Sequence, residues 1–359
     1  MSPVTPISQI LFEKLGLTPR LSFAAVMELA LYHAEHGYYG PGPRRIGRGG
    51  DFYTAVSVGP LYGRLLADLA RQTWADLGQP ESFCVIEQAA HDGQLAEDIL
   101  TAADFDYVIV EPNPRYEAVQ RERLAAFGTR VTWVASLADL PARPALFVCN
   151  ELPDAMPVHL VQWDGTQWRE LFVVSQTVPG SQFPVLGWEA GDASEELRDE
   201  LARLPDDLPE GYTTEINLAA LQWMRELAAA PFHGRIYIAD YGLDDEELYS
   251  IERTKGTLRR YYQHQTDDKV LENLGECDLT THVNFTRLVE TAEEAGLKLR
   301  SYEHQGRYLG KMGLAWLATL EGKRPDAGTQ ALLRQFHSLT HPAMMGRSFR
   351  VVEMGKGTV

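Results

Sequence analysis

Short apolar runs alternate with helical segments over residues 83–151, and this alternation leaves few folds open to the chain. The runs have the length and composition of buried strands, and they lie at residues 83–88, 107–112, 130–136 and 145–151. Helical patterns at residues 93–102 and 113–128 separate the first three of them. Continuous apolar strands joined by helices predict a parallel sheet that is covered on both faces.

The same α/β pattern resumes late in the chain. A strand is expected at residues 235–242, an amphipathic helix at 284–296, and two further strands at 297–304 and 347–355 could close the sheet. We therefore expect a Rossmann-like, mostly parallel α/β sheet built from two separated parts of the chain.

Other segments interrupt or precede this sheet. Helices are predicted at residues 22–36 and 61–77, with a loop rich in Gly, Pro and aromatic residues between them. Asp164-Gly165 between two alternating runs predicts a β-hairpin. The predicted organisation is an N-terminal segment, a cofactor-binding half of the sheet domain, an insertion of a hairpin and helices, and a second half with the closing strands, at residues 1–80, 81–157, 158–212 and 213–359.

Charge and composition limit the partners. Asp plus Glu number 50 and Lys plus Arg 33, so the net charge is −17, which disfavours nucleic-acid binding. Such a charge could attract a basic protein segment, or it could be a solvated acidic surface. No run is apolar enough to cross a bilayer and no secretory signal is visible, so we expect no membrane association and a cytoplasmic protein. The three cysteines have no metal-ligand spacing, and no metal is expected.

Acidic residues stand at the expected strand ends, where ligands bind in open α/β sheets. Glu87 ends the first strand, Gly93 opens the following helix, and Glu111 ends the second strand about 20 residues later. A carboxylate at that place binds ribose hydroxyls in adenosine-containing cofactors. Two carboxylates would disfavour a polyanionic ligand and would suit a cation such as S-adenosylmethionine. The alternative for each residue is a solvated acid at the surface.

A second polar group follows the fourth strand. Asn150, Glu151 and Asp154 could hold an amine or guanidinium beside the cofactor. Asp154 could instead cap a helix, and Asn150 could simply end the strand. Asp51, in the glycine-rich loop, could be a turn residue or part of a lid over the cofactor.

His264, His282 and His341 share no metal-ligand spacing and are interpreted as structural or substrate-facing. The aromatic insertion strands, with Trp163, Trp168 and Trp188, could form a homodimer contact or pack within their own domain.

Nine short motifs in order, from "GYYGPG" through "GDFYTA", "VIEQAAHDGQLAEDIL", "YVIVEPNP", "CNELPDAMPV", "IADYG", "GTLRRYYQH" and "CDLTTHVNF" to "LTHPAMMGRSFRVV", resemble the MidA-type S-adenosylmethionine-dependent methyltransferases. The resemblance covers residues 20–355. These proteins are relatives of the mitochondrial complex I assembly factor that methylates arginine on a partner subunit.

The resemblance implies a class I methyltransferase fold, S-adenosylmethionine as cofactor and a protein substrate, with arginine as the acceptor. It places Glu87, Gly93 and Glu111 in the cofactor site, and Asn150, Glu151 and Asp154 in the substrate motif.

The sequence departs from the family pattern at the cofactor turn. Ala89, Ala90 and His91 replace the family's Gly-Pro-Gly. Alanine tolerates such a turn where its φ stays negative, whereas the larger His91 would crowd a ligand if its ring pointed inward. We expect an altered but intact turn.

Two function classes follow. The first is an S-adenosylmethionine-dependent methyltransferase that acts on a nitrogen of a protein side chain. The second is a degenerate, non-catalytic assembly or scaffold factor with the same fold, which the altered turn would favour. An NAD-dependent dehydrogenase is disfavoured because the glycine fingerprint is incomplete.

Overall fold

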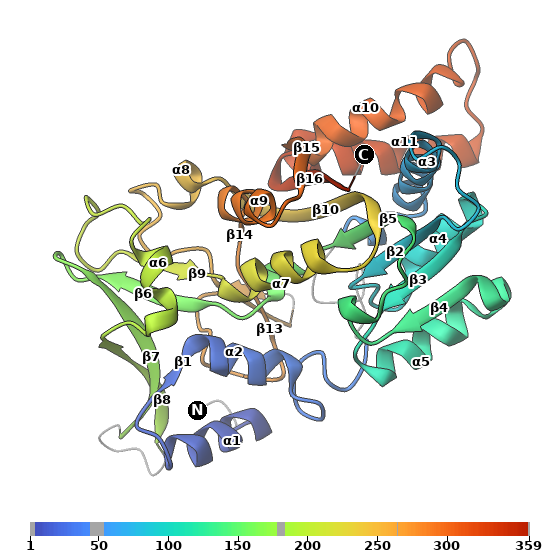
Figure 1. The fold of residues 1–359 in the computed structure, drawn as a ribbon. Coiled ribbons are helices and arrows are strands. Elements are labelled where there is room, and N and C mark those ends of the chain that lie inside the picture. Colours follow the sequence, from blue (N-terminus) through green and yellow to red (C-terminus); the bar gives the residue numbers. More distant parts are fainter. Residues whose placement is uncertain (1–3, 44–53, 178–183, 264, 358–359) are drawn as a thin grey trace. The chain divides into compact units, whose positions relative to one another are not determined.

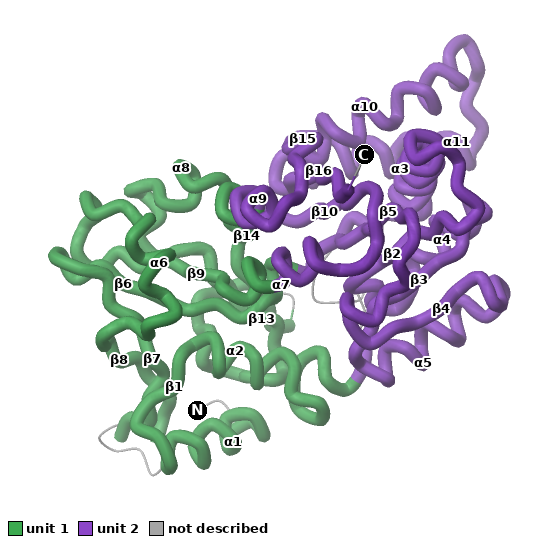
Figure 2. The backbone as a smooth tube through the Cα atoms, in the orientation of Figure 1, with its two compact units in different colours: residues 1–41, 153–222, 243–288 green, residues 42–152, 223–242, 289–359 purple. Residues whose placement is uncertain are grey.

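The computed structural model describes residues 4–43, 54–177, 184–263 and 265–357 (Figure 1). Asp51 and His264 therefore lie outside the described residues. The chain forms two compact units, each assembled from three separate segments (Figure 2). Unit 1 consists of residues 1–41, 153–222 and 243–288, and unit 2 of residues 42–152, 223–242 and 289–359.

Unit 2 contains the sheet that the alternating runs predict. Seven of its strands lie in the order β15-β16-β10-β5-β2-β3-β4. Their bounds are Lys298–His304, Phe349–Lys356, His233–Leu243, Pro144–Asn150, Cys84–Gln88, Asp106–Val110 and Val131–Val134. The five strands from β10 to β4 are parallel, whereas β16 runs antiparallel to both β10 and β15. The predicted mostly parallel α/β sheet is confirmed.

The central strands form because their side chains are apolar on both faces. All seven residues of β5 are buried, as are the first four of β2. A strand without a polar face is stable only with both faces covered. Helix α3 (Leu61–Asp76) contributes to this cover with Leu61, Leu65 and Leu69, the stripe expected from the sequence.

The helices of unit 2 include two, α10 (Gln305–Ala318) and α11 (Ala327–Thr340), that were not predicted from the sequence. Those that connect or cover the sheet are α3, α4 (Gln94–Ala102), α5 (Pro114–Arg123), α10 and α11. Glycines weaken the helical pattern of α10. Two of them allow close packing, because a Cβ at Gly306 would lie 2.3 Å from the Thr340 carbonyl oxygen and one at Gly313 would lie 2.5 Å from the Phe336 ring. Helices α7 (Leu218–Ala229) and α9 (Phe285–Glu294) begin in unit 1 and end in unit 2.

Unit 1 is built on antiparallel sheets. The larger one has the order β1-β7-β6-β9, with β8 paired to β7, and its strands are Leu21–Ser22, Trp168–Gln176, His159–Trp163, Thr213–Ile216 and Val185–Gly191. A small sheet has the order β12-β11-β13, with strands Gln265–Asp267, Arg259–Tyr262 and Asp278–Thr280. The short strand β14 (Val283–Asn284) precedes α9. Helices α1, α2, α6 and α8 span Pro6–Leu15, Phe23–Tyr32, Arg198–Leu201 and Asp245–Leu248.

The predicted hairpin is confirmed, with Trp163 opposite Trp168 across its turn. The Asp164 carboxylate accepts hydrogen bonds from the backbone N–H groups of Thr166 and Gln167, which fixes the turn. Trp163 and Trp168 pack with Tyr212 in a buried apolar cluster, and the Trp188 ring lies 5.4 Å from that of Phe23. These tryptophans therefore pack within unit 1.

The helix predicted at residues 22–36 is shorter in the structure, where it is α2 (Phe23–Tyr32). Ser22 caps α2 as expected, but the helix ends at Tyr32. Tyr38 and Tyr39 donate backbone hydrogen bonds to the carbonyls of Ala30 and Leu31, which closes the helix end. A Cβ at Gly40 would lie 2.0 Å from the His33 carbonyl oxygen, so this turn requires glycine. No helix among the described residues is long and apolar enough to cross a membrane.

Candidate functional site

The carboxyl ends of three adjacent parallel strands carry the predicted site residues of unit 2. Glu87 lies on β2, opposite Ile109 of β3 and Val148 of β5. Glu111 follows β3, and Asn150 and Glu151 follow one another at the end of β5. The sheet therefore brings these four residues to one edge, as the sequence predicts.

The turn between β2 and α4 has the backbone of a glycine-rich turn, with alanine and histidine at two of its left-handed positions. Ala89, His91 and Gly93 have φ values of 68°, 48° and 84°. Ala89 does not meet the condition of a negative φ under which alanine tolerates such a turn. The left-handed region costs a residue with a Cβ about 1–2 kcal/mol, so residues 89 and 91 keep the turn's shape under strain. Strain of this kind concentrates at functional sites.

We predict that Ala89→Gly stabilises the chain. Glycine removes the left-handed strain but adds freedom to the unfolded chain, and the net gain should be about 0.5–1 kcal/mol in urea unfolding. Ala90 is the matched control, because it lies in the same turn and is not among the residues with positive φ. Ala90→Gly should destabilise by about 1 kcal/mol. Equal effects of the two substitutions would contradict the assigned strain.

Helix α5 holds this turn through two polar side chains. Arg123 donates to the Asp92 carbonyl at 2.9 Å and to the Asp92 carboxylate at 2.7 Å. It also bonds Gln94 and Glu97 at the start of α4. Gln120 donates to the His91 carbonyl at 2.9 Å. The strained turn is therefore fixed by side chains outside it.

His91 is packed against the turn's own neighbours. Its ring meets the Tyr116 ring edge-on at 5.7 Å, and its Nδ1 lies 3.7 Å from the Asp92 carboxylate. The aromatic contact gives the imidazole a defined place beside α5. The structure thus accommodates the side chain that replaces the family's second glycine.

Glu111 is oriented by two donors. Its Oε1 accepts from the Asn113 backbone N–H and its Oε2 from Gln120 Nε2, both at 2.9 Å. The residue is 8% exposed, and burial raises the pKa of its carboxyl, opposed by these two hydrogen bonds. A carboxylate has about four acceptor positions, so capacity remains for two hydroxyl donors.

Glu87 is more deeply buried than Glu111 and faces Tyr107. It is 2% exposed, and the Tyr107 hydroxyl donates to its Oε2 at 2.7 Å. Burial raises the pKa of Glu87 to about 8, although the Tyr107 hydrogen bond lowers it. At neutral pH the carboxyl is therefore mostly protonated.

Asn150 and Glu151 form a hydrogen-bonded pair. Asn150 accepts from the Tyr62 hydroxyl at 2.8 Å and donates to Glu151 Oε1 at 2.9 Å. The Ala55 backbone N–H also bonds this oxygen, at 3.3 Å. Glu151 has a φ of 54°, so the end of β5 carries the same left-handed strain as the turn after β2.

Asp154 belongs to unit 1, where it lies in the short 3-10 turn Pro153–Ala155 and is buried. Its carbonyl accepts the Thr281 backbone N–H at 2.9 Å. Tyr39 donates to both carboxylate oxygens of the buried Asp278, at 2.9 and 3.0 Å. Burial, followed by the charges of Asp278 and Asp154, raises the pKa of Tyr39. Unit 1 thus contains two buried carboxyl groups beside tyrosines.

Of the three histidines singled out from the sequence, His282 and His341 are among the described residues, and both have structural surroundings. Burial, assisted by Arg253 and Arg259, lowers the pKa of His282 to about 4, so it is neutral at physiological pH. The His341 side chain accepts from the Ala343 backbone N–H and caps the turn after α11. No group of three or more His, Cys, Asp or Glu residues among those described could hold a metal ion.

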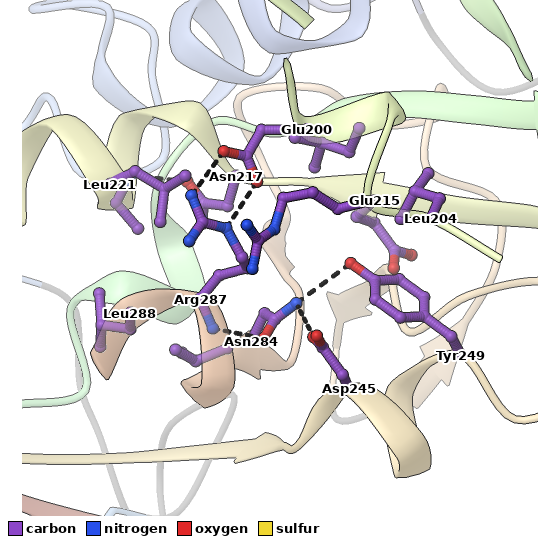
Figure 3. Close-up of a pocket in the computed structure, with 14 residues that line it drawn as sticks. Glu200, Leu204, Glu215, Asn217, Leu221, Asp245, Tyr249, Asn284, Arg287 and Leu288 are labelled. Carbon is purple, nitrogen blue, oxygen red and sulfur yellow. Dashed lines mark hydrogen bonds and ion pairs between the residues drawn. The ribbon is translucent and has the colours of Figure 1, made fainter. Parts of the chain in front are cut away.

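A small cavity in unit 1 is lined by charges that are already paired (Figure 3). Its volume is about 30 Å³, enough for one or two water molecules. Arg287 donates to both oxygens of Glu200, at 2.7 and 2.8 Å, and Asn284 bonds Asp245 and Tyr249. None of the predicted site residues lines it, and we assign it no ligand.

Sequence reasoning missed Gln120, Arg123, Tyr62 and Tyr107, which orient the predicted residues. One signal was present for Gln120. Tyr116, Gln120 and Leu124 recur every four residues and are all buried, so a polar residue interrupts an apolar stripe. A buried amide needs hydrogen-bond partners, which makes such an interruption informative.

The model of a family described as "Putative S-adenosyl-L-methionine-dependent methyltransferase" matches residues 65–303. Curated relatives include the "Protein arginine methyltransferase NDUFAF7 homolog, mitochondrial" of Drosophila melanogaster, 26% identical over 96% of this chain and 84% of that protein. The "Protein arginine methyltransferase NDUFAF7, mitochondrial" of Homo sapiens is also 26% identical, over 97% and 83%.

Solved structures from Burkholderia thailandensis resemble the whole chain. A COG1565 superfamily member bound to S-adenosyl-homocysteine is 30% identical, with a TM-score of 0.86 over 98% of this chain and 92% of that chain. A native structure of a COG1565 superfamily protein is 29% identical, with a TM-score of 0.84 over the same shares. The likeness confirms the predicted class I methyltransferase fold.

Proposed function

Because the chain belongs to the family of S-adenosyl-L-methionine-dependent methyltransferases, we propose that it methylates a side-chain nitrogen of a protein substrate, with arginine as the acceptor. The cofactor follows from the family and from the 30% identical structure bound to S-adenosyl-homocysteine. Arginine is supported by the names of relatives that are about a quarter identical. The cytoplasm remains our proposed compartment.

The donor set at the edge of the sheet fits an adenosyl cofactor. Glu111 would accept the ribose hydroxyls, because its carboxylate is pre-oriented and has acceptor capacity left. The strained turn leads into α4 at Gly93, and the backbone N–H groups of a helix N-terminus are donors for a ligand, although the Gln94 N–H already bonds the Asp92 carboxylate at 3.2 Å. Glu87 and Asp51 complete the proposed cofactor set.

S-adenosylmethionine supplies an electrophilic methyl group on its sulfonium. The residues of the chain would have to orient an acceptor nitrogen in line with that methyl carbon and to accept one proton from the nitrogen. Asn150 and Glu151 would hold the guanidinium by hydrogen bonds, since a carboxylate matches its fork of donors. Once that proton is released, the methylated arginine remains a cation. Asp154, in unit 1, stays a predicted catalytic residue.

We predict that Glu111→Gln weakens binding of S-adenosyl-homocysteine about 10- to 100-fold, because the ribose hydroxyls would lose their hydrogen bonds to a charged carboxylate. Titration calorimetry measures this directly. Glu122→Gln is the matched control, because it removes the same charge from an exposed position of α5. Equal affinities of the two variants would contradict the ribose role of Glu111.

Turnover decides between a methyltransferase and the alternative, a non-catalytic assembly factor, which the strained turn with Ala89 and His91 at left-handed positions favours. Isotope-labelled methyl transfer from S-adenosylmethionine to an arginine-rich protein fraction, located by mass spectrometry, is the expected result. Glu151→Gln should abolish the label while S-adenosyl-homocysteine still binds. Binding of the cofactor with no labelled protein would favour the assembly factor, and label on lysine would refute arginine specificity.

A further inference from the structure

Gln120 makes every hydrogen bond that its amide needs inside the candidate cofactor site. It lies on α5, is fully buried, and donates from Nε2 to Glu111 Oε2 and to the His91 carbonyl, both at 2.9 Å. Its Oε1 accepts from Trp133 Nε1 of β4, also at 2.9 Å. One side chain thus connects the proposed ribose acid, the strained turn and the next strand.

The chemistry of the partners fixes which way the amide faces. An indole N–H can only donate, so Trp133 requires the oxygen of Gln120 on its side. The amide NH₂ must then face Glu111 and His91, whose carboxylate and carbonyl can only accept. The orientation of the Gln120 amide therefore follows from the chemistry of its three partners.

A packing role alone does not explain this residue. Its helix neighbours on the buried stripe, Tyr116 and Leu124, are largely apolar, and a buried amide is costly unless it is fully bonded. An apolar side chain of the same volume would fill the space at less cost. Two of the three bonds, to Glu111 and to the His91 carbonyl, involve groups that the proposed function assigns to the cofactor site.

We propose that Gln120 is a positioning residue for the adenosyl cofactor, because it fixes the Glu111 carboxylate and the backbone of the His91 turn in one geometry. This inference rests on the proposed function. The amide contacts neither the cofactor nor the acceptor, and acts through Glu111 and through the turn. Pre-orientation by a supporting shell of this kind governs affinity more than the chemical step.

The test replaces Gln120 by methionine, which keeps the volume and removes the donors. Gln120→Met should weaken S-adenosyl-homocysteine binding about 10-fold or more by calorimetry. It should raise the KM for S-adenosylmethionine by a similar factor, with kcat at saturation within about 3-fold. Glu122→Gln, on the exposed face of the same helix, should change neither quantity.

A second variant protects the test against misfolding. Trp133→Phe keeps Gln120 but removes the donor that orients its amide, and should weaken binding about 3-fold with a cooperative unfolding transition retained. Native affinity in either folded variant overturns the inference. If the native chain does not bind S-adenosyl-homocysteine, the proposed function fails. Binding that Glu111→Gln weakens and Gln120→Met leaves intact refutes only the positioning role.

Discussion

The free energy of unfolding is expected to fall as the pH rises from about 4.5 to about 8, and Glu87→Gln should remove this part of the fall. Burial raises the pKa of Glu87 from 4.5 to about 8 in the folded chain. In that interval the folded state holds a proton that the unfolded state has released. The stabilisation from the protonated carboxyl is complete below pH 4.5 and is lost as the pH passes 8.

The expected effect is large because the slope approaches about 1.4 kcal/mol per pH unit within this interval. Other groups also titrate in this interval. The informative quantity is therefore the difference in the free energy of unfolding between the native chain and Glu87→Gln at each pH. That difference should shift in favour of the variant as the pH rises and should level off above about pH 8. Parallel stability curves would contradict the assignment.

Tyr107→Phe provides an independent check. The Tyr107 hydroxyl donates to Glu87 and lowers its pKa, so its removal should move the fall in stability to higher pH. Urea unfolding between pH 5 and 9 measures both variants. A fall displaced to lower pH would mean that the hydroxyl stabilises the neutral carboxyl.

Release of the Glu87 proton can also be used to test where the cofactor binds. A cation next to Glu87 would favour the carboxylate and lower its pKa. S-adenosylmethionine carries an ammonium and a sulfonium, whereas S-adenosyl-homocysteine lacks the sulfonium. Release of more protons with S-adenosylmethionine than with S-adenosyl-homocysteine at pH 7, measured in buffers of different ionisation enthalpy, would place Glu87 at the sulfonium.

The strands could be predicted because their signal is local. An apolar run such as residues 145–149 is stable only in a covered sheet, and β5 (Pro144–Asn150) forms there with every residue buried. The acids at strand ends followed from the same logic, since parallel strands bring Glu87, Glu111 and Glu151 to one edge. The apolar runs thus predicted the sheet, and the residues at their ends predicted where the candidate site residues lie.

The supporting residues could not be predicted in the same way. Arg123 and Gln120 meet the turn from a helix about 30 residues away, and nothing local marks their partners. Ala89 has a positive φ that alanine itself disfavours, and these contacts to His91 and Asp92 hold the turn in which it lies. The assembly of unit 1 from three separate segments depends equally on pairing between distant strands, such as β1 with β7.

Arg287→Met is expected to destabilise unit 1 by about 3–5 kcal/mol, the cost of breaking a buried ion pair by removing one partner. Arg287 and Glu200 are 10% and 13% exposed, and they are joined by two hydrogen bonds of 2.8 and 2.7 Å. The substitution leaves the Glu200 carboxylate in the wall of the small cavity in Figure 3. Little water is available there to solvate the unpaired charge.

An exposed ion pair, Arg198 with Glu195, is the control for this substitution. Arg198 and Glu195 lie 3.3 Å apart but are 74% and 86% exposed, so Arg198→Met should cost less than about 0.5 kcal/mol in urea unfolding. Replacing both buried partners, as in Glu200→Leu with Arg287→Met, should recover much of the loss, because no charge is left unpaired. A double variant as unstable as Arg287→Met alone would show that Arg287 stabilises unit 1 through its packing, and that the ion pair with Glu200 contributes little.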